Sequence, residues 1–362
     1  MKIILAAGGS GGPVAPLLAV AKQIQHLHGQ CEFLLVGTQH GPEREMALTD
    51  HIPFTPIVSG KFRRYFSWLN FFSPFLVVVG FFQAVNELRK FKPNIVLGSG
   101  SFVQVPVVWA AWVLRIPILL HQQDLYPSLA NKLCSLMATK ITVTFENSIR
   151  DFSQSVGIIY KRKPDKVVQT GNPFREELSI ANKYDAIKSY DFSSDLPTIF
   201  ITGGGTGAVV LNKIVEDSLP ELLKFAQVIH STGAKKQLHF EHPRYRQYEF
   251  ITDMAIVYAA ADIVVSRAGL STITELSNLE KISIIIPMPN SHQELNGVLL
   301  SHMGGAVVVE QQALTPNKFI QLIRSVLFDS KLQNSLKNNI GKLMPKHSAK
   351  KIAEIAISLA AR

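Results

Sequence analysis

Short apolar segments of strand length alternate with amphipathic segments of helix length along most of this 362-residue chain. An apolar run at residues 2–7 is followed by a glycine loop at 8–12 and by a helical pattern from Pro13. The same order returns at residue 198, where a second apolar run leads into a glycine loop at 203–207. Strands that alternate with helices are typical of parallel sheets covered by helices on both faces. The pattern therefore predicts an α/β protein built from two similar domains.

The remaining apolar runs set the expected domain boundaries. Residues 1–165 are predicted to form an N-terminal Rossmann-like domain and residues 166–345 a second one, with doubly wound parallel sheets that face each other across a cleft. Residues 346–362 are expected to end the chain with an amphipathic helix. The other strands are expected at residues 32–36, 94–97, 116–120, 166–170, 226–231, 248–251, 263–265, 283–286 and 306–309.

Residues 65–86 carry no charge, although basic residues flank them at 61–64 and 89–92. A transmembrane helix needs about 20 predominantly apolar residues, and Asn70 and Pro74 interrupt this segment. We expect an aromatic-rich helix that lies on an anionic membrane surface, with a buried helix and a spanning helix as alternatives. The side chains expected to enter the bilayer surface are Trp68, Phe71, Phe72, Phe75, Phe81 and Phe82.

The composition is that of a globular protein, with 47% hydrophobic and 18% charged residues. Cys31 and Cys134 lie in apolar surroundings without a CxxC or Cys/His cluster, which favours core residues in a reducing compartment over a zinc site or a disulfide. The first apolar run leads directly into a glycine loop and does not resemble a signal peptide, so a cytoplasmic location is expected. A net charge of +10 suits a phosphate-rich ligand, an acidic lipid surface or nucleic acid.

The stretch 262–275 is the clearest candidate for ligand chemistry. A short apolar strand passes through Gly269 into a helix that is expected to begin near Ser271 or Thr272. Unpaired backbone N–H groups and the positive end of the helix dipole at such a start favour a phosphate. Glu275 follows one turn later, where its carboxylate could accept two sugar hydroxyls. The alternative is a capping box, in which Glu275 bonds only the start of its own helix.

The first glycine loop argues against a dinucleotide-binding dehydrogenase. Its spacing is not G-x-G-x-x-G, and the strand at 32–36 ends at residues 37–39 (Gly-Thr-Gln) without the acidic residue that holds a ribose. The strand at 116–120 leads into residues 121–124 (His-Gln-Gln-Asp). Ligands collect at the carboxyl ends of strands in open α/β sheets, so these polar residues are candidates for function.

Eight short motifs occur in an order and spacing that together are specific for one family. They are Gly8-Gly-Ser-Gly-Gly12, Gly98-x-Gly100 with Pro106, His121-Gln-Gln-Asp124, Gly171-Asn-Pro-x-Arg175, Gly203-Gly-x-x-Gly-Ala208, Phe250-Ile-x-Asp-Met254, Ser266-Arg-x-Gly269 through Glu275, and His292-Gln-x-x-Asn296. With these motifs the chain resembles the bacterial undecaprenyl-pyrophosphoryl-muramoylpentapeptide β-N-acetylglucosaminyltransferases (the MurG family, in glycosyltransferase family 28), which are inverting enzymes of the GT-B fold.

The resemblance implies transfer of GlcNAc from UDP-GlcNAc to the muramoyl 4-hydroxyl of lipid I. The product would be lipid II, an intermediate of the peptidoglycan synthesis on which cell-wall biogenesis, cell shape and cell division depend. The implied partners are UDP-GlcNAc, undecaprenyl-linked lipid I and the anionic inner-leaflet membrane surface, with a peripheral location on the cytoplasmic face of the cell membrane and no nucleic acid. No cofactor is implied, and the sequence contains no Asp-x-Asp pair of the kind that metal-using nucleotide-sugar enzymes show.

By residue match, the second domain would bind the donor. Ile251 would contact the uracil, Glu275 the ribose hydroxyls, and Arg175 would lie near the diphosphate. The full set of expected donor-binding residues is Arg175, Gly205, Ile251, Leu270, Ser271, Thr272, Ile273, Thr274, Glu275, His292 and Gln293. The phosphate loop that is expected to meet the acceptor on the first domain consists of Ser10, Gly11 and Gly12.

The resemblance is weaker in the first domain, where the general base is expected. The family usually has a histidine, a candidate base, where this chain has Pro13, and a tyrosine where it has Phe102. Its His-Glu-x-Asn pattern is His-Gln-Gln-Asp at residues 121–124 here. Because proline cannot accept a proton, His121 and Asp124 are the predicted catalytic residues. The alternative for His121 is a strand-end side chain with a satisfied hydrogen bond and no catalytic role.

These departures leave other functions open. The altered first domain also fits a related GT-B enzyme acting on another lipid-linked or glycan acceptor, or a catalytically inactive nucleotide-sugar-binding protein. A UDP-GlcNAc 2-epimerase is a further alternative, although such an enzyme should not need the aromatic segment at 65–86. In the donor loop, Gly205 stands where the family usually has a serine.

Overall fold

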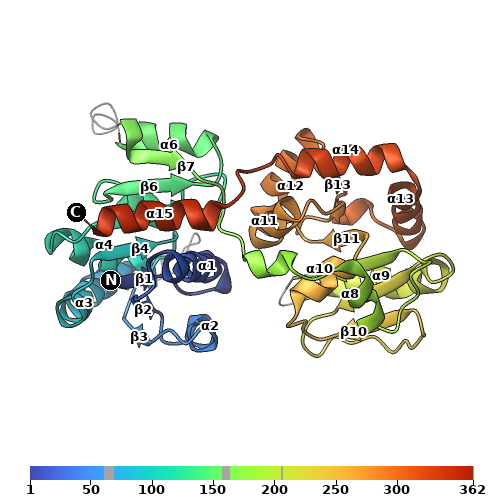
Figure 1. Cartoon of the computed structure of the whole chain (residues 1–362), viewed down its shortest axis with the longest axis horizontal. Helices are drawn as coiled ribbons and strands as arrows, with labels where there is room; N and C mark the ends of the chain where they lie inside the picture. The colour runs from blue at the N-terminus through green and yellow to red at the C-terminus, as the bar shows by residue number, and fades with distance from the viewer. Residues whose placement is uncertain (61–68, 157–163, 205–206, 362) are drawn as a thin grey trace. The chain divides into compact units, whose positions relative to one another are not determined.

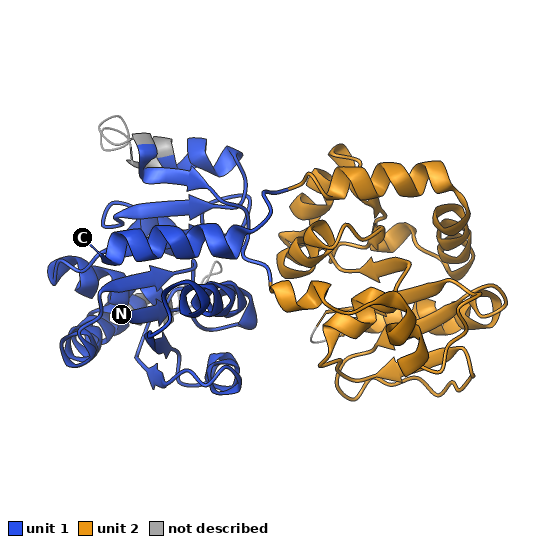
Figure 2. Ribbon diagram, viewed as in Figure 1, with its two compact units in different colours: residues 1–174, 344–362 blue, residues 175–343 orange. Residues whose placement is uncertain are grey.

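The computed structural model describes residues 1–60, 69–156, 164–204 and 207–361 (Figure 1). The chain divides into two compact units (Figure 2). Unit 1 contains Met1–Phe174 and Met344–Arg362, and unit 2 contains Arg175–Leu343. Each unit is a parallel sheet with helices packed against it, which confirms the α/β class predicted from the alternating pattern.

The sheet of unit 1 has the strand order β3-β2-β1-β4-β5-β6-β7 in the described part of the chain. Both neighbours of β1 are parallel to it. Strands β2 and β3 lie on one side of β1, and β4 to β7 lie on the other, so the strand order reverses between β1 and β4. The loops after these two strands therefore meet at a topological switch point. The strands are β1 (Lys2–Ala6), β2 (Glu32–Gly37), β3 (Phe54–Pro56), β4 (Ile95–Gly98), β5 (Ile118–Gln122), β6 (Lys140–Val143) and β7 (Val167–Gln169). The helices are α1 (Gly11–His28), α2 (Glu43–Thr49), α3 (Leu69–Phe91), α4 (Gln104–Val113), α5 (Leu129–Cys134), α6 (Asn147–Val156), η1 (Pro164–Lys166) and α15 (Ser348–Ala360).

Alternation along the strands gives this sheet two apolar faces. On one face, Ile3 and Leu5 pack with α1 and with apolar residues of α15 such as Ile352. On the other face, Ile4 and Ala6 pack with residues of α3, α4 and α6. A strand buried on both faces needs the continuous apolar run that β1 has, because successive side chains point to opposite sides.

Two segments join unit 1 although the sequence suggested otherwise. The strand expected to open the second domain, β7, pairs with β6 and is the last strand of the first sheet. Helix α15, the red helix in Figure 1, packs beside α1. Its residues Ile352, Ala353, Ala356 and Leu359 lie in the same core as β1, so the end of the chain completes the first unit.

The sheet of unit 2 has the order β10-β9-β8-β11-β12-β13 in the described residues. Alternate residues of β8, β9 and β11 form a core with α9 and α13. The strands are β8 (Thr198–Thr202), β9 (Gln227–Ser231), β10 (Tyr245–Tyr248), β11 (Ile263–Ser266), β12 (Ser283–Ile285) and β13 (Val307–Val308). The helices are η2 (Glu176–Ser179), α8 (Lys183–Ser189), α9 (Val209–Leu222), α10 (Met254–Ala260), α11 (Leu270–Asn278), α12 (Gln293–His302), η3 (Gln311–Ala313), α13 (Pro316–Phe328) and α14 (Ser330–Ile340).

One expected strand, at residues 248–251, is misplaced. The structure puts β10 at Tyr245–Tyr248, because the buried Tyr245 hydroxyl lies 2.9 Å from His230 Nδ1 and anchors this strand against β9. Phe250 and Ile251 therefore follow the sheet edge, and Phe250 is 66% exposed. Apolar residues beyond a strand end are available to a ligand.

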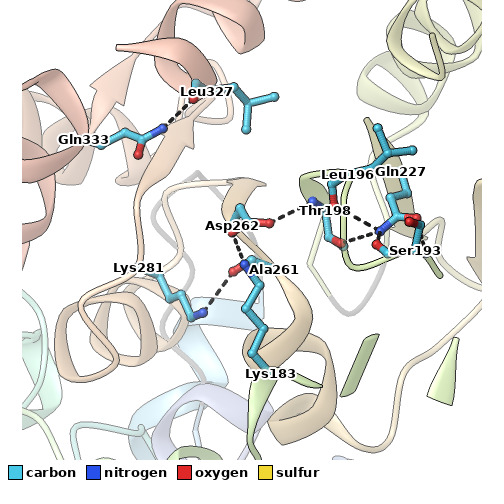
Figure 3. Close-up of polar contacts among 10 residues, drawn as sticks. All are labelled: Lys183, Ser193, Leu196, Thr198, Gln227, Ala261, Asp262, Lys281, Leu327 and Gln333. Carbon is cyan, nitrogen blue, oxygen red and sulfur yellow. Dashed lines mark hydrogen bonds and ion pairs between the residues drawn. The ribbon is translucent and has the colours of Figure 1, made fainter. Parts of the chain in front are cut away.

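Polar side chains tie together the amino ends of the strands in unit 2 (Figure 3). Asp262 accepts a hydrogen bond from the Thr198 backbone N–H at 2.9 Å and forms an ion pair with Lys183. The Lys281 ammonium donates to the Ala261 carbonyl at 2.9 Å, and burial lowers the pKa of Lys281 to about 8. These contacts lie at the sheet edge opposite the loops that carry ligand chemistry in such folds, so they stabilise the unit.

Helix α3 presents a mixed face. Phe75, Val78 and Phe82 are 66%, 50% and 66% exposed, whereas Val77 and Phe81 pack against the core of unit 1. No helix in the described ranges combines the length and the apolar character needed to cross a bilayer. Among the aromatic residues expected at a membrane, Phe71 and Phe72 lie in α3, and Trp68 lies outside the described residues.

Candidate functional site

In unit 2, helix α11 begins directly after a buried strand. Gly269 is its N-cap residue, and no side chain caps the helix start. The Ile273 N–H donates to the Gly269 carbonyl at 2.9 Å and is the first of the intrahelical bonds. The N–H groups of Leu270, Ser271 and Thr272 therefore precede the helical ladder and are directed out of the helix start. An anion placed there meets these donors and the positive end of the helix dipole.

The Glu275 carboxylate stands one turn along α11 with a partner on each oxygen. Arg175 Nη2 lies 3.2 Å from Glu275 Oε1, and the Tyr258 hydroxyl donates to Oε2 at 2.6 Å. A carboxylate has about four lone-pair directions. One acceptor position on each oxygen therefore remains for a pair of vicinal hydroxyls.

Glu275 is not a capping residue. The sequence left a capping box with Thr272 as one interpretation, but α11 starts two residues earlier, at Leu270. At that register Thr272 lies inside the helix, and the Glu275 carboxylate is directed to Arg175 and Tyr258. The capping-box interpretation is therefore wrong.

Tyr258 holds the Glu275 carboxylate in place, and no motif in the sequence indicated this role. It is 1% exposed in α10, and its ring packs edge-on against Phe200 at a centroid distance of 5.9 Å. Burial, followed by the negative charge of Glu275, raises the pKa of Tyr258 well above its usual value. The hydroxyl therefore stays protonated and donates to Glu275 at all ordinary pH values. From the sequence alone, a tyrosine at an apolar helix position is predicted to be a core residue, so its role at the site could not be identified.

Two further residues hold the loops around the α11 start. Asn296 Nδ2 donates to the Ala268 carbonyl at 3.0 Å, in the turn just before the helix. The Arg267 guanidinium donates to the carbonyls of Ile286 and Pro287 at 3.1 and 3.2 Å. Both residues belong to motifs seen in the sequence, but only the structure gives their contacts.

The other expected donor residues differ in accessibility. Ser271 and His292 are exposed, and Ile251, Thr272 and Gln293 are half-buried. Gln293 Oε1 accepts from the Met288 N–H at 3.1 Å, which leaves its amide N–H groups for a ligand. Ile273 and Thr274 are each 2% exposed, and the Thr274 hydroxyl donates to the Leu270 carbonyl, so their side chains serve packing. Gly205 lies outside the described residues.

In unit 1, the expected phosphate loop leads into α1. Ser10 is the N-cap residue and makes no side-chain cap, and no acidic residue occupies the first turn of the helix. The buried Glu43 carboxylate accepts hydrogen bonds from the Gly9 N–H at 3.2 Å and the Thr38 N–H at 2.6 Å. Gly9 has a φ of 83°, and a Cβ there would lie 2.6 Å from the Phe102 ring. Only glycine therefore fits at position 9.

A cavity of about 690 Å³ opens beside this loop. Both glycine loops at the switch point line it, together with apolar residues of α3, α4 and α5. Pro13 and Phe102, two of the positions where the chain departs from the family pattern, both lie in its wall. The lining residues in the described chain are Gly8, Gly9, Ser10, Pro13, Gly60, Ser73, Pro74, Val77, Val78, Gly100, Ser101, Phe102, Val105, Trp109, Ser128, Leu129, Ala130 and Leu133.

His121 lies inside the core of unit 1. It is 2% exposed, and its two ring nitrogens lie 3.0 Å from Thr142 Oγ1 and 3.0 Å from Asn172 Oδ1. Burial lowers the pKa of His121 to about 4, partly offset by the hydrogen bond with Asn172. This environment fits the alternative interpretation of His121, a strand-end side chain with satisfied hydrogen bonds and no role as the base.

Asp124, in contrast, is exposed on the loop after β5. The buried Gln122 holds this loop. Its Nε2 donates to the carbonyls of Asp124 and Tyr126 at 2.9 Å each, and its Oε1 accepts from the Ser128 N–H at 3.2 Å. A glutamate at position 122 could not donate these two bonds, because an ionised carboxylate has no donor and a protonated one has a single O–H. Gln123 Nε2 donates to the Ser99 carbonyl at 3.2 Å and so connects the loop to the rim of the cavity.

No group of three or more His, Cys, Asp or Glu side chains in the described ranges is arranged to hold a metal ion. Cys31 and Cys134 are both free cysteines. The polar groups of the two sites include backbone N–H groups, hydroxyls, amides, guanidinium groups and carboxylates, which suit binding of phosphate and sugar hydroxyls and removal of a proton.

Comparison with known proteins gives matches in both units. Residues 3–143 match the model of the glycosyltransferase family 28 N-terminal domain, and residues 198–354 match that of the family's C-terminal domain. A Clostridium kluyveri protein is 37% identical over 332 residues, which cover 90% of this chain and 91% of that protein. It is named a UDP-N-acetylglucosamine–N-acetylmuramyl-(pentapeptide) pyrophosphoryl-undecaprenol N-acetylglucosamine transferase.

Solved structures resemble this chain over nearly its full length. The crystal structure of Acinetobacter baumannii MurG covers 99% of both chains with a TM-score of 0.73 and 26% identity, which confirms the predicted GT-B fold. The UDP-GlcNAc 2-epimerase from Neisseria meningitidis, bound to UDP-GlcNAc, covers 99% of this chain with a TM-score of 0.67. At 17% identity that likeness shows the fold alone.

Proposed function

The chain belongs to glycosyltransferase family 28, and we propose that it transfers GlcNAc from UDP-GlcNAc to the muramoyl 4-hydroxyl of undecaprenyl-linked lipid I, forming lipid II. The observation that carries this proposal is the Glu275 carboxylate, held by Arg175 and Tyr258 one turn from an open helix start. That spacing places a diol acceptor beside a phosphate site, as a nucleoside diphosphate requires.

Unit 2 binds the donor in this proposal. The two remaining acceptor positions of Glu275 take the ribose hydroxyls, and Ile251 and Phe250 offer an apolar surface to the uracil. The N–H groups of Leu270, Ser271 and Thr272 stabilise the diphosphate, with the Arg175 guanidinium one helical turn away beside Glu275. As the bond to the sugar breaks, negative charge grows on the leaving UDP, and oriented donors of this kind stabilise that charge.

Unit 1 binds the acceptor and supplies the base. Asp124 takes the proton from the acceptor hydroxyl, whose oxygen attacks the anomeric carbon as UDP leaves from the opposite face. His121 cannot take this proton, because both its ring nitrogens are engaged inside the core. It serves instead as a positioning residue that fixes the end of β5. Gln122 then fixes the loop on which Asp124 stands.

Unit 1 also meets the membrane in this proposal, at the cytoplasmic face of the cell membrane. Exposed apolar side chains occur on three helices, with α3 in contact with α4 and α4 in contact with α5. A peripheral surface of this kind inserts shallowly among lipid headgroups, and the basic residues Arg89 and Lys90 at the end of α3 favour anionic lipid. The exposed apolar residues on these helices are Phe75, Val78, Phe82, Trp112, Val113, Leu129 and Leu133, and Leu136 follows the end of α5.

The membrane surface is tested by replacing Phe75 and Phe82 with serine. The double variant is expected to lose most of its binding to vesicles of anionic phospholipid. Phe328→Ser is the matched control, since Phe328 is also 66% exposed but belongs to unit 2. Vesicle binding that is equally weakened by both changes would show that the α3 surface has no special role.

The reaction is tested with purified protein, labelled UDP-GlcNAc and a lipid I analogue. We expect labelled GlcNAc on the lipid and an equal amount of UDP. Release of UDP without transfer to lipid would contradict the proposal and point to hydrolysis or epimerase-like chemistry. Tight UDP binding with no turnover on any lipid-linked acceptor would favour an inactive nucleotide-sugar-binding protein.

A second acceptor is the one alternative that an observation favours. Pro13 and Phe102 both line the cavity of unit 1, where the family's histidine and tyrosine would make the wall more polar. If transfer occurs to another lipid-linked saccharide and fails with lipid I, the enzyme class stands and the acceptor is reassigned.

A further inference from the structure

Three buried side-chain amides connect the loops that follow β4 and β5 in unit 1. Gln104 and Asn131 are fully buried, and Gln122 is 1% exposed. Gln104 Nε2 donates to Asn131 Oδ1 at 2.6 Å, and Asn131 Nδ2 donates to Gln122 Oε1 at 2.7 Å. These residues belong to α4, α5 and the end of β5, so the fold brings them together from separate parts of the sequence. We refer to them as the amide chain.

Backbone groups at both ends fix the direction of the amide chain. At one end, Gln104 Oε1 accepts from the Gly100 N–H at 2.8 Å. At the other end, Gln122 Nε2 donates to the carbonyls of Asp124 and Tyr126 at 2.9 Å each. A backbone N–H can only donate and a carbonyl can only accept. Turning any one amide over would therefore place two donors or two acceptors against each other.

Asn131 also joins the amide chain to the start of α5. Its Nδ2 donates to the His121 carbonyl at 3.2 Å, and its backbone N–H donates to Ser128 Oγ at 3.1 Å. The Ser128 hydroxyl donates to the Gly100 carbonyl at 3.3 Å, and the Ser128 N–H donates to Gln122 Oε1 at 3.2 Å. Hydrogen bonds buried in this way are stronger than exposed ones. The loops after β4 and β5 are therefore held at a fixed spacing from below.

We propose that Gln104 and Asn131 are positioning residues for the reaction, which act through Gln122 to hold the Asp124 carboxylate where the acceptor hydroxyl meets it. This inference rests on the proposed role of Asp124 as the base and deepens it. Both amides are fully buried, so they act through the backbone of the Asp124 loop and not by touching substrate. Such an effect can be large, because a displacement of about 1 Å can lower a rate about 100-fold.

The first test is Gln104→Met, which keeps the length of the side chain and removes its bonds to Gly100 and Asn131. We expect turnover with UDP-GlcNAc and a lipid I analogue to fall about ten-fold, with the KM for UDP-GlcNAc unchanged because unit 2 is unaltered. Gln227→Met is the matched control, since Gln227 is a 1% exposed amide that holds a loop of unit 2 (Figure 3). It should keep full turnover, and urea unfolding shows whether the two variants lose similar stability.

The Asp124→Asn background separates positioning from general destabilisation. If Gln104 acts through the Asp124 carboxylate, Gln104→Met should lower turnover no further once that carboxylate is gone. A change that merely loosens unit 1 would lower turnover by the same factor in both backgrounds. Asn131→Asp is a second variant, for use if Gln104→Met does not fold. It keeps the acceptor for Gln104 and replaces the amide donors, so the same pattern is expected.

Hydrogen exchange gives a readout that does not depend on the reaction. The Ser128 N–H should exchange about ten-fold faster in Gln104→Met, because its acceptor on Gln122 is no longer held, and at the unaltered rate in Gln227→Met. The inference is overturned if this exchange does not change, if turnover does not change, or if turnover falls equally in both backgrounds. GlcNAc transfer with any of these results removes only the inference. Faster exchange in a protein that transfers no GlcNAc keeps the amide chain as the support of this loop and removes the proposed reaction.

Discussion

The two units prepare for their ligands in opposite ways. In unit 2 the Glu275 carboxylate already has a partner on each oxygen, so its orientation is fixed by Arg175 and the buried Tyr258. In unit 1 the donors Ser101 Oγ and Trp109 Nε1 stand unpaired in a largely apolar wall. The first arrangement orients a charge for a polar ligand. The second suits the apolar part of an amphiphile.

This difference also determines how much variation in the ligand each unit can accept. A fixed carboxylate at an open helix start demands one geometry of diol and phosphate, since the acceptors and donors are a few bonds apart. A largely apolar wall accepts ligands that differ in length beyond the cavity. Changes such as Pro13 and Phe102 fall in this second kind of site, whereas the contacts of Glu275 involve no such change.

The largest effect is expected from Asp124→Asn, which removes the proposed base. Turnover should fall about 100- to 10,000-fold, the range that general base catalysis contributes. UDP binding should stay the same, because unit 2 is untouched. Asp165→Asn, also exposed and in unit 1, is the control. Steady-state turnover that Asp124→Asn leaves unchanged would exclude this carboxylate as the base.

Glu275→Gln tests the fixed carboxylate of unit 2. The amide loses the ion pair with Arg175 and one of the two ribose contacts, so the Kd for UDP should rise about 100-fold. Glu221→Gln, on the exposed face of α9, is the matched control for calorimetric titration. Equal loss in both variants would contradict the assignment.

Acidification should destabilise both units through one buried histidine in each. His121 in unit 1 and His230 in unit 2 have pKa values lowered by burial to about 4, below the usual 6.5. The unfolded chain therefore binds more protons between these values. The stabilisation is complete above pH 6.5 and is lost as the pH falls towards 4, with each histidine contributing about 3 kcal/mol.

The two histidines can be separated by fluorescence, because all three tryptophans lie in the sequence of unit 1. His121→Gln should flatten the pH dependence of urea unfolding followed by tryptophan emission. His230→Gln should leave that signal's pH dependence unchanged. The assignment to His121 fails if its variant keeps the full dependence between pH 7 and pH 4.5.

The smallest effect is expected from Tyr258→Phe. The ring and its packing remain, and one hydrogen bond to Glu275 is lost, so UDP affinity should fall about ten-fold with little change in turnover at saturating donor. Tyr184→Phe is the control, since Tyr184 is 71% exposed in the same unit. If both variants bind UDP equally, Tyr258 does not position the carboxylate.

Much of the donor site could be predicted because its parts are local in sequence. Ile263 to Glu275 form one strand-turn-helix unit, and helix geometry alone places the free N–H groups and the carboxylate together. Tyr258 could not be predicted, because its contact with Glu275 depends on the packing of α10 against β8. Arg175 was expected near the donor from the family resemblance, but its ion pair with Glu275, across 100 residues of sequence, could not be predicted.

The sequence by itself determined the alternation of strands and helices, the two glycine loops and the family, since each rests on short-range pattern and motif order. Only the tertiary structure decided that β7 and α15 complete unit 1, that His121 is a core residue, and that Ser101 and Trp109 share one cavity. The physical reason is that sheet pairing, burial and cavity walls are made by residues far apart in the chain, whose local patterns do not encode which partners they meet.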